Sequence, residues 1–291
     1  MKALIIGMGI GELYRSVYTN LGWDIVTCDT VKPADFNSVE EITGEYDIAH
    51  VCTPNFTHEN IARSIAEFCK IVFVEKPGVE NKLLWQSLVD TFPNTRFAMV
   101  KNNQFRSNTS KLHKIAQGSD FIELCWLNKN RVPHPGSWFT TKKLAYGGVS
   151  RDLLPHLLSW VQVLHPFYTG MTLSHSETHQ NYTLEDLENT EYGEINMDGT
   201  YDVDDSARIV LKDGHRVFSC EAAWKCDTIK DNVALYFYNK TKLIHKEELG
   251  LCPEEAYKEM VDSAWKNVYN DAYWKKQLMH DIWIHQQLQD M

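Results

Sequence analysis

Two side chains suited to acid–base chemistry stand four residues apart near the middle of this chain. Asp152 and His156 follow the glycine pair Gly147-Gly148. Because residues i and i+4 share one face of a helix, both side chains can point into the same cleft. A carboxylate beside an imidazole fixes its tautomer and stabilises its protonated form, as a general base near neutral pH requires. The alternative interpretation is a helix-capping aspartate and an unrelated histidine, since short motifs often arise by chance.

The helix that must position this pair has a proline inside the motif. Pro155 lacks an amide hydrogen and is tolerated in the first turn of a helix, where amides have no intrahelical partner. We therefore expect the helix to begin near Asp152.

The first third of the chain alternates short apolar runs with helical patterns. The expected strands are residues 2–6, 24–28, 48–52, 71–74 and 96–100, and the expected helices are residues 12–21, 57–68 and 81–92. This alternation predicts an α/β domain with a doubly wound, Rossmann-type parallel sheet. Apolar runs without polar alternation, such as residues 71–74, are typical of strands buried on both sides.

Glycines follow the first expected strand directly. Gly7, Gly9 and Gly11, with Ile10 between the last two, stand where the strand should pass into the first helix. Glycines there let backbone amides approach a pyrophosphate, and a helix N-terminus favours its negative charge. The spacing departs from G-x-G-x-x-G because Glu12 holds the third glycine position. Either the turn is one residue short, or the close contact between helix and strand tolerates Glu12.

An acidic residue ends the second expected strand. Asp29 stands where such a residue meets a ribose 2′-hydroxyl in dinucleotide sites. Its carboxylate would repel a 2′-phosphate, and no arginine follows to offset it, although Lys32 is close. We therefore expect NAD as the cofactor, with NADP as the less favoured alternative. The other interpretation of Asp29, an ordinary loop acid, agrees less well with its place in the βαβ unit.

Polar turns also follow the third and fourth expected strands. Thr53, Pro54, Asn55 and His58 come after one strand, and Glu75-Lys76-Pro77 comes after the next. Each segment alone could be simple turn chemistry. Ligands of open parallel sheets bind beyond the carboxyl ends of the strands, so together these turns are expected at the edge that carries the glycine loop.

With these segments in this order, the chain resembles the glucose–fructose oxidoreductase, inositol dehydrogenase and rhizopine-catabolism (Gfo/Idh/MocA) oxidoreductases. The similarity rests on the glycine loop, Thr53-Pro54-Asn55 with His58, Glu75-Lys76-Pro77, Gly147-Gly148 with Asp152 and His156, and Val203-Asp204-Asp205. The resemblance implies that Lys76, Asp152 and His156 are catalytic. The cofactor-binding residues it implies are Gly7, Gly9, Ile10, Gly11, Asp29, Thr53, Pro54, Asn55, His58, Glu75 and Lys76. The expected substrate-binding residues are Arg106, Trp138, Asp152 and His156, although Trp138 could instead anchor a surface loop.

This family implies an NAD-dependent dehydrogenase acting on CH–OH groups. Hydride would pass between the nicotinamide and a hydroxyl carbon of a sugar, a nucleotide sugar or a cyclic polyol. One alternative is an NAD-dependent lyase or glycosidase that oxidises its substrate transiently. Another is a non-catalytic NAD-binding sensor. The resemblance also implies a homodimer or homotetramer.

The pattern changes after residue 104. Further strands are expected at residues 121–128, 172–177, 206–211, 216–224 and 232–238, and helices at residues 107–117, 257–268 and 272–287. Consecutive strands predict an open, largely antiparallel sheet. We therefore expect a Rossmann domain at residues 1–104 and an α+β domain for substrate binding and oligomerisation at residues 105–291, with an acidic, solvated loop at residues 185–194.

The composition excludes several classes of function. A formal net charge of −10 over 291 residues argues against nucleic acid or an anionic membrane as the main partner. No apolar run is long enough to span a bilayer, and residues 1–7 are expected to form a strand rather than a signal peptide. The seven cysteines are scattered without a C-x-x-C pair, so we expect no metal site, no disulfide framework and a cytoplasmic location.

Overall fold

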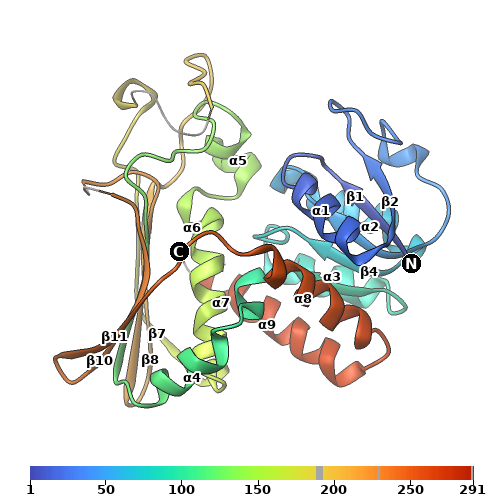
Figure 1. Ribbon diagram of the computed structural model, residues 1–291. Helices are drawn as coiled ribbons and strands as arrows, with labels where there is room; N and C mark the ends of the chain where they lie inside the picture. The colour runs from blue at the N-terminus through green and yellow to red at the C-terminus, as the bar shows by residue number, and fades with distance from the viewer. Residues whose placement is uncertain (188–192, 228–229, 290) are drawn as a thin grey trace. The chain divides into compact units, whose positions relative to one another are not determined.

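The computed structural model describes residues 1–187, 193–227, 230–289 and 291 (Figure 1). The chain forms two compact units, one of Met1–Phe105 with Pro253–Gln286 and one of Arg106–Cys252 with Gln287–Met291. From the sequence, every residue after 104 was expected in the second domain. The C-terminal helices instead complete the first unit, because they bury their apolar faces there. Residues 188–192 of the expected acidic loop lie outside the described residues.

The first unit is built on a parallel sheet. Its strands are β1 (Lys2–Ile6), β2 (Asp24–Cys28), β3 (Tyr46–Val51), β4 (Cys69–Val74) and β5 (Arg96–Met99), and its helices are α1 (Gly11–Leu21), α2 (His58–Ile65), α3 (Lys82–Thr91), α8 (Glu254–Lys266) and α9 (Asp271–Gln289). The strand order is β2-β1-β3-β4-β5, and every pairing is parallel. The predicted doubly wound sheet is confirmed. Its strand order reverses beside β1, where such sheets bind ligands.

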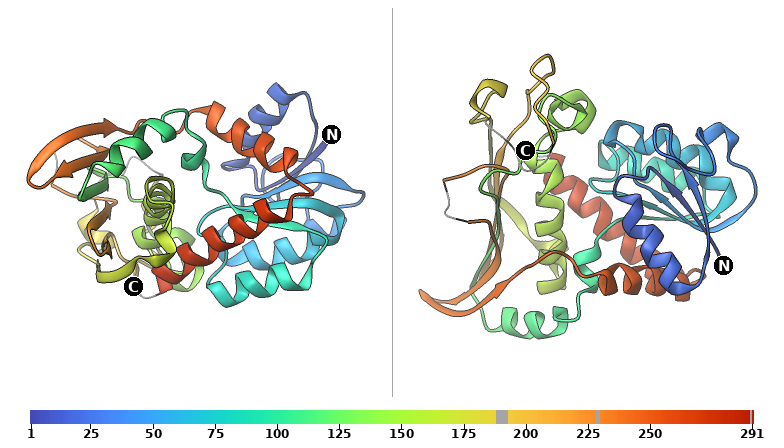
Figure 2. Two further views of the ribbon diagram at one scale, coloured as in Figure 1. Left: turned by 90° about the horizontal axis from the view of Figure 1, so that it is seen from below. Right: turned by 45° about the horizontal axis from the view of Figure 1, so that its top comes forward.

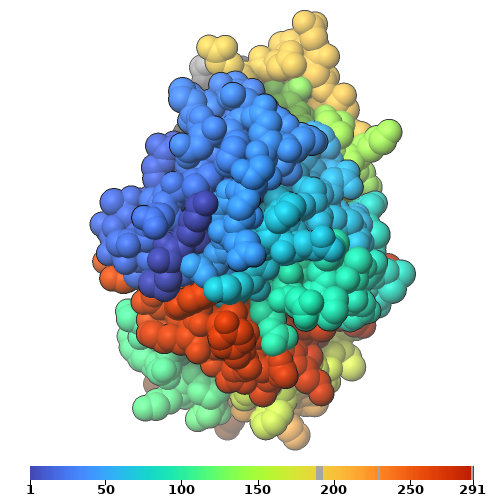
Figure 3. Space-filling view, turned by 90° about the vertical axis from the view of Figure 1, so that its right-hand side faces the viewer, coloured from blue at the N-terminus to red at the C-terminus, as the bar shows by residue number. Residues whose placement is uncertain are grey.

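One apolar core joins this sheet to helices from both ends of the chain. Ile5 and Ile48 of the sheet share a buried cluster with Tyr14 of α1 and Val261 of α8. Figure 3 shows the orange-red surface of the C-terminal helices adjoining the blue and teal surface of the N-terminal part. Burial of apolar side chains therefore ties residues more than 240 positions apart into one unit.

The second unit is built on a mixed sheet. Its helices are α4 (Thr109–Gln117), α5 (Lys142–Ala145), α6 (Val149–Asp152) and α7 (Leu154–Leu164), and its strands are β6 (Phe121–Leu127), β7 (Thr172–His179), β8 (Ser206–Asp213), β9 (Arg216–Ala223), β10 (Asn232–Asn239) and β11 (Lys242–Glu248). The strand order is β11-β10-β6-β9-β8-β7. Only the pairing of β6 with β9 is parallel among these described strands, which confirms the largely antiparallel sheet.

The two faces of this sheet differ in character. Helices α4 and α7 lie on one face (Figures 1 and 2). Leu124, Ile209 and Phe218 are completely buried on the strands, whereas Arg208 and Tyr236 keep part of their surface exposed. Within the described part of the chain, the unit thus has one apolar face under its helices and one more polar face. None of the described helices is long and apolar enough to cross a membrane.

Candidate active site

The glycine loop joins β1 to α1 by a tight turn. A Cβ on Gly7, where φ is +91°, would lie 2.6 Å from the carbonyl oxygen of Cys52, and one on Gly11 would lie 2.8 Å from Cγ2 of Ile5. Gly11 is the first residue of α1, so it makes the close contact between helix and strand. The turn is therefore one residue shorter than in G-x-G-x-x-G, and Gly11 rather than Glu12 takes the place of the third glycine.

The other side of the loop is open. A Cβ on Gly9 would meet no described atom within 4 Å, and Ile10 is 47% exposed. The first amides of an α-helix have no intrahelical partner and carry the positive end of its dipole. The loop packs tightly against Cys52 at Gly7 and is open at Gly9, so a dinucleotide pyrophosphate can reach its backbone amides.

Asp29 lies at the predicted end of β2 and contacts the glycine loop. Its Oδ2 accepts a 2.6 Å hydrogen bond from the amide of Met8, and its Oδ1 accepts 2.8 Å bonds from the amides of Val31 and Lys32. Burial alone would raise the pKa of this carboxyl, but the amide hydrogen bonds hold it below its usual range. The Lys32 ammonium donates to the carbonyl oxygen of Met8 at 2.7 Å. Backbone amides therefore hold Asp29 as an ionised carboxylate, and the Lys32 ammonium contacts the same loop.

His58 connects the turns after β3 and β4. It is completely buried, with Nδ1 2.7 Å from the carbonyl oxygen of Gly78 and Nε2 2.7 Å from that of Thr53. Burial lowers the pKa of His58 to about 4, although the hydrogen bonds to the two carbonyl groups raise it. His58 therefore connects the two turns, with each ring nitrogen at hydrogen-bonding distance from one carbonyl oxygen. Of the expected cofactor residues nearby, Asn55 is buried, while Thr53 and Pro54 are half-buried.

Glu75 and Lys76 begin the turn after β4. The hydroxyl of Tyr14 donates a 2.7 Å hydrogen bond to Glu75 Oε1, and the Lys76 amide lies 3.2 Å from Glu75 Oε2. Both side chains are half-buried at the carboxyl edge of the sheet. No local pattern pointed to Tyr14, because its partner Glu75 lies 61 residues away in the chain.

In the second unit, Asp152 and His156 do not share one continuous helix. Asp152 is the last residue of α6, and α7 begins at Leu154 after a break at Leu153. The helix that carries His156 thus begins two residues after Asp152, close to the expected start, but Asp152 itself belongs to the preceding helix. Pro155 stands in the first turn of α7, where its missing amide costs nothing, so the break falls just before it.

Asp204 holds the start of α6. Its Oδ1 accepts hydrogen bonds from the amide of Gly148 at 2.8 Å and from Ser150 Oγ at 3.0 Å, and its Oδ2 accepts the Ser150 amide at 2.7 Å. A Cβ on Gly148 would lie 1.8 Å from the Asp204 carbonyl oxygen, so this position requires glycine. The Val203-Asp204-Asp205 segment, noted in the sequence only as a family landmark, thus anchors the segment that carries Asp152.

Two tryptophans contact the expected catalytic side chains of this unit. Trp224, buried just after β9, donates from Nε1 to Asp152 Oδ2 at 2.8 Å. The ring of Trp126 on β6 lies 5.3 Å from that of His156, with 33° between the planes. Aromatic residues are commonly read as core, so no sequence signal separated these two from the others.

The two remaining expected substrate residues also lie in the second unit. Arg106 donates from Nη2 to the carbonyl oxygen of Gly250 at 2.8 Å. Trp138 is half-buried and stacks on Phe139 with 3.9 Å between ring centroids. Trp138 is therefore held in place within its loop, as both the binding and the anchoring interpretation require.

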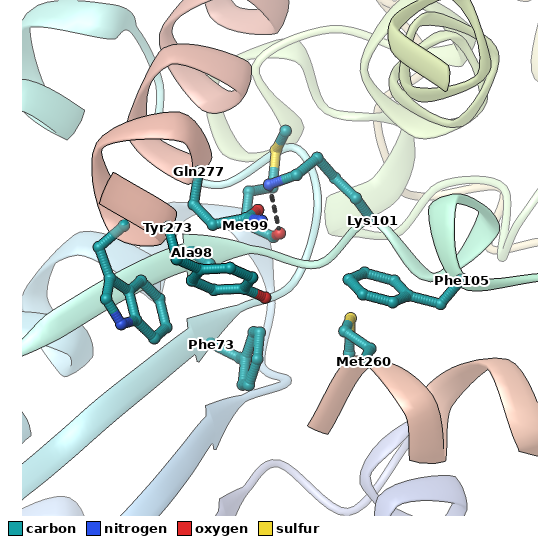
Figure 4. A pocket seen from close by; sticks show the side chains of 9 residues that line it. Phe73, Ala98, Met99, Lys101, Phe105, Met260, Tyr273 and Gln277 are labelled. Carbon is teal, nitrogen blue, oxygen red and sulfur yellow. Dashed lines mark hydrogen bonds between the residues drawn. The ribbon is translucent and has the colours of Figure 1, made fainter. Parts of the chain in front are cut away.

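A small cavity lies within the first unit, away from the glycine loop. Phe73, Phe105, Met260 and Tyr273 line it, and Lys101 donates to the Met99 carbonyl at its edge (Figure 4). Its volume of about 10 Å³ has room for one water molecule and not for a dinucleotide. Among the described residues, no group of three histidine, cysteine or acidic side chains could hold a metal ion.

Part of the parallel-sheet unit is similar to a known oxidoreductase family. Residues 23–98 match the GFO_IDH_MocA family model, described as an oxidoreductase family with an NAD-binding Rossmann fold. A candidate oxidoreductase subunit of UDP-kanosamine synthase from Amycolatopsis mediterranei (strain S699) is 24% identical over 184 residues. That match covers 56% of this chain and 51% of the relative, so the chain spans about half the length of this curated relative.

Solved structures with the same fold cover nearly the whole chain. A levoglucosan dehydrogenase in complex with NADH and levoglucosan has a TM-score of 0.73 at 15% identity, over 100% of this chain and 97% of the other. A myo-inositol dehydrogenase from Corynebacterium glutamicum ATCC 13032 has a TM-score of 0.72 at 11% identity, over 99% and 94%. Identities this low establish the fold alone. Together with the family-model match at residues 23–98, they confirm the expected NAD-binding Rossmann fold.

Proposed function

We propose that this protein is an NAD-dependent dehydrogenase that acts on a hydroxyl carbon of a sugar, a nucleotide sugar or a cyclic polyol. The observation that carries the proposal is the edge of the parallel sheet, where an open glycine loop adjoins a fixed carboxylate. Gly7 and Gly9 form the loop, and Asp29 accepts the Met8 amide beside it. This arrangement suits a pyrophosphate next to a ribose without a 2′-phosphate.

The residues that would hold NAD follow from that edge. The amides of the glycine loop and of the first turn of α1 would bind the pyrophosphate, and Asp29 would accept hydrogen bonds from ribose hydroxyls. Three amides already bond to Asp29, but two carboxylate oxygens offer about four acceptor sites. Glu75 and the Thr53–Asn55 turn would contact the nicotinamide half of NAD. His58 would support both turns through its contacts with the carbonyl groups of Thr53 and Gly78. When bound, the nicotinamide supplies the hydride acceptor.

Three side chains would perform the acid–base chemistry. His156 would take the proton of the substrate hydroxyl, because an unperturbed imidazole accepts protons near neutral pH. Lys76 would stabilise the developing negative charge on the substrate oxygen. Asp152 would orient His156 or bind a neighbouring hydroxyl. Trp224 donates a hydrogen bond to Asp152 Oδ2 and so fixes the carboxylate for either role.

The substrate class is supported by the names of similar proteins. One solved structure with this fold contains levoglucosan, another contains UDP-GlcNAcA, and the curated relative is named for UDP-kanosamine. Arg106 and Trp138 are our candidates for contacts to a polyhydroxylated ring. Trp138 offers an apolar face and Arg106 offers hydrogen-bond donors, the two features that sugar sites combine.

The more polar face of the mixed sheet is our candidate for an interface between identical subunits. Arg208 and Glu221 pair in register there, and Tyr236 lies on the strand beyond β6. We expect a homodimer or homotetramer. Light scattering with size-exclusion chromatography would measure the mass, and Tyr236→Lys should shift it toward the monomer.

Mixing the protein with NAD and a panel of sugars, nucleotide sugars and polyols tests the activity. Net formation of reduced nicotinamide, read at its absorbance maximum, is the expected result. Bond cleavage without net reduction would instead indicate the lyase or glycosidase, and tight NAD binding without turnover on any substrate would indicate the sensor.

A further inference from the structure

We propose that Tyr14 is a positioning residue for the cofactor, and that its hydroxyl fixes the carboxylate of Glu75 for binding on the nicotinamide side. The inference rests on the proposed function, because it requires Glu75 to contact NAD. Tyr14 would act only through Glu75 and would not touch the cofactor itself.

The geometry links two parts of the expected site. Tyr14 stands three residues after Gly11, in the first turn of α1, and its hydroxyl lies 2.7 Å from Glu75 Oε1 at the end of β4. Helix α1 opens at the glycine loop, whereas Glu75 begins the turn that carries Lys76. This one hydrogen bond therefore joins the pyrophosphate side of the sheet edge to its nicotinamide side.

The Tyr14 ring has no room to turn away. It is completely buried and stacks on His50 with 3.9 Å between centroids and 28° between planes. Phe73 stacks on the far side of His50 at 4.9 Å, and Tyr257 of α8 meets Tyr14 edge-on at 5.7 Å. Packing on these sides fixes the ring, so the direction of its hydroxyl is fixed as well.

The hydroxyl is a permanent donor. Burial raises the pKa of Tyr14 well above its usual value, and the charge of Glu75 raises it further. Hydrogen bonds to an ionised acceptor are shorter and stronger than those between neutral groups. With Tyr14 on Oε1 and the Lys76 amide near Oε2, the plane of the Glu75 carboxylate is set before any ligand binds. A pre-set acceptor lowers the ordering cost of binding.

The test is Tyr14→Phe, which keeps the ring and its stacking and removes only the donor. NAD should bind about 10-fold more weakly, as loss of one hydrogen bond to a charged group implies. Titration calorimetry measures the NAD dissociation constant directly. ADP, which lacks the nicotinamide ribose, should bind with unchanged affinity. If ADP binding were weakened as much as NAD binding, the variant would disturb the whole glycine loop, and the inference would be overturned.

Tyr18→Phe is the matched control. Tyr18 lies one turn further along α1 and is equally buried, and its hydroxyl is hydrogen-bonded to Nε2 of His50 at 2.8 Å rather than to Glu75. Loss of the Tyr18 hydroxyl should lower thermal stability and leave the NAD dissociation constant within about twofold, because this hydroxyl is bonded to His50 and not to Glu75. An equal loss of NAD affinity in both variants would assign the effect to core packing.

A double-mutant cycle distinguishes the role of Tyr14 from that of Glu75. Glu75→Ala should weaken NAD binding, and adding Tyr14→Phe to it should have no further effect, since Tyr14 acts through Glu75. If Glu75→Ala leaves NAD binding unchanged, the proposed role of Glu75 fails. If Glu75→Ala weakens binding while Tyr14→Phe does not, or if the two effects simply add, only the role of Tyr14 fails.

Discussion

The indole nitrogen of Trp224 donates a 2.8 Å hydrogen bond to Oδ2 of Asp152. Trp224 is 1% exposed and follows β9 directly, so the donor comes from the rigid sheet. Asp152 stands at the end of a four-residue helix, which alone would hold its side chain poorly. The position of the Asp152 carboxylate therefore depends on the sheet as much as on its own helix.

Trp224→Phe should lower kcat/KM about 10-fold through the loss of this bond, without changing NAD affinity. Steady-state kinetics and NAD titration measure the two effects. Trp160→Phe is the control, because Trp160 is also fully buried in this unit and its Nε1 has no hydrogen-bond partner among the described residues. Equal losses of kcat/KM in the two variants would show that packing, and not the hydrogen bond, is responsible.

A second prediction concerns the anchor of α6. Asp204→Ala removes the acceptor of two amides and one hydroxyl and should cost about 2–3 kcal/mol in the free energy of unfolding. Chemical denaturation measures this loss. Asp202→Ala is the control, since Asp202 Oδ1 accepts only the Lys142 amide among the bonds described for its side chain, and a cost below about 1 kcal/mol is expected. Similar costs in both variants would contradict the anchoring role.

Local sequence patterns reveal some features of this fold and miss others. The parallel strands were predictable because each is an apolar run that ends in a polar turn. Strand β11 was missed, since Lys242–Glu248 is an edge strand whose residues are mostly exposed, and so it lacks an apolar face. The contacts of Tyr14 with Glu75 and of Trp224 with Asp152 span 61 and 72 residues, and no local periodicity encodes such pairs. The place of α8 on the first unit was missed for the same reason.

Cofactor choice is expected to depend on Asp29. Asp29→Ala should weaken NAD binding and leave NADP binding no worse, shifting the relative affinity by about 2–4 kcal/mol. Fluorescence titration with both dinucleotides measures the ratio. Asp35→Ala is the control, because Asp35 also bonds the end of β2, through the amide and hydroxyl of Thr27, but not the glycine loop. A wild-type protein that binds NADP more tightly than NAD would refute the assignment, and Lys32 would then be the residue to examine.

Stability should fall as the solution becomes acidic, in part through His50. Burial lowers the pKa of His50 to about 3, below the usual imidazole value of about 6.5. The unfolded state then binds more protons than the folded state, so the free energy of unfolding drops as pH falls below about 6.5. His50 alone should contribute about 1.4 kcal/mol per pH unit across that window. His50→Phe should reduce the slope by this amount, whereas His215→Ala, at an exposed turn, should leave it unchanged.

The last prediction tests the proposed base. His156→Ala should lower turnover by roughly 10²–10⁴-fold and leave NAD affinity nearly unchanged. Lys76→Ala should be at least as damaging, because it removes the positive charge expected beside the substrate oxygen. Asp152→Asn should cost less turnover than either if Asp152 only orients His156, and should raise KM if Asp152 binds a substrate hydroxyl.

The pH profile distinguishes the histidine from the lysine as the base. For substrate oxidation, kcat/KM should rise with pH through a limb near neutrality, because an imidazole must lose its proton before it can accept one. That limb should disappear or move in His156→Ala, measured on the residual activity. His156→Gln is the companion variant, since it keeps a hydrogen-bonding side chain beside Trp126 but cannot titrate. A limb that stays in place in both variants would assign the base to Lys76, and His156 would then serve as a ligand for the substrate.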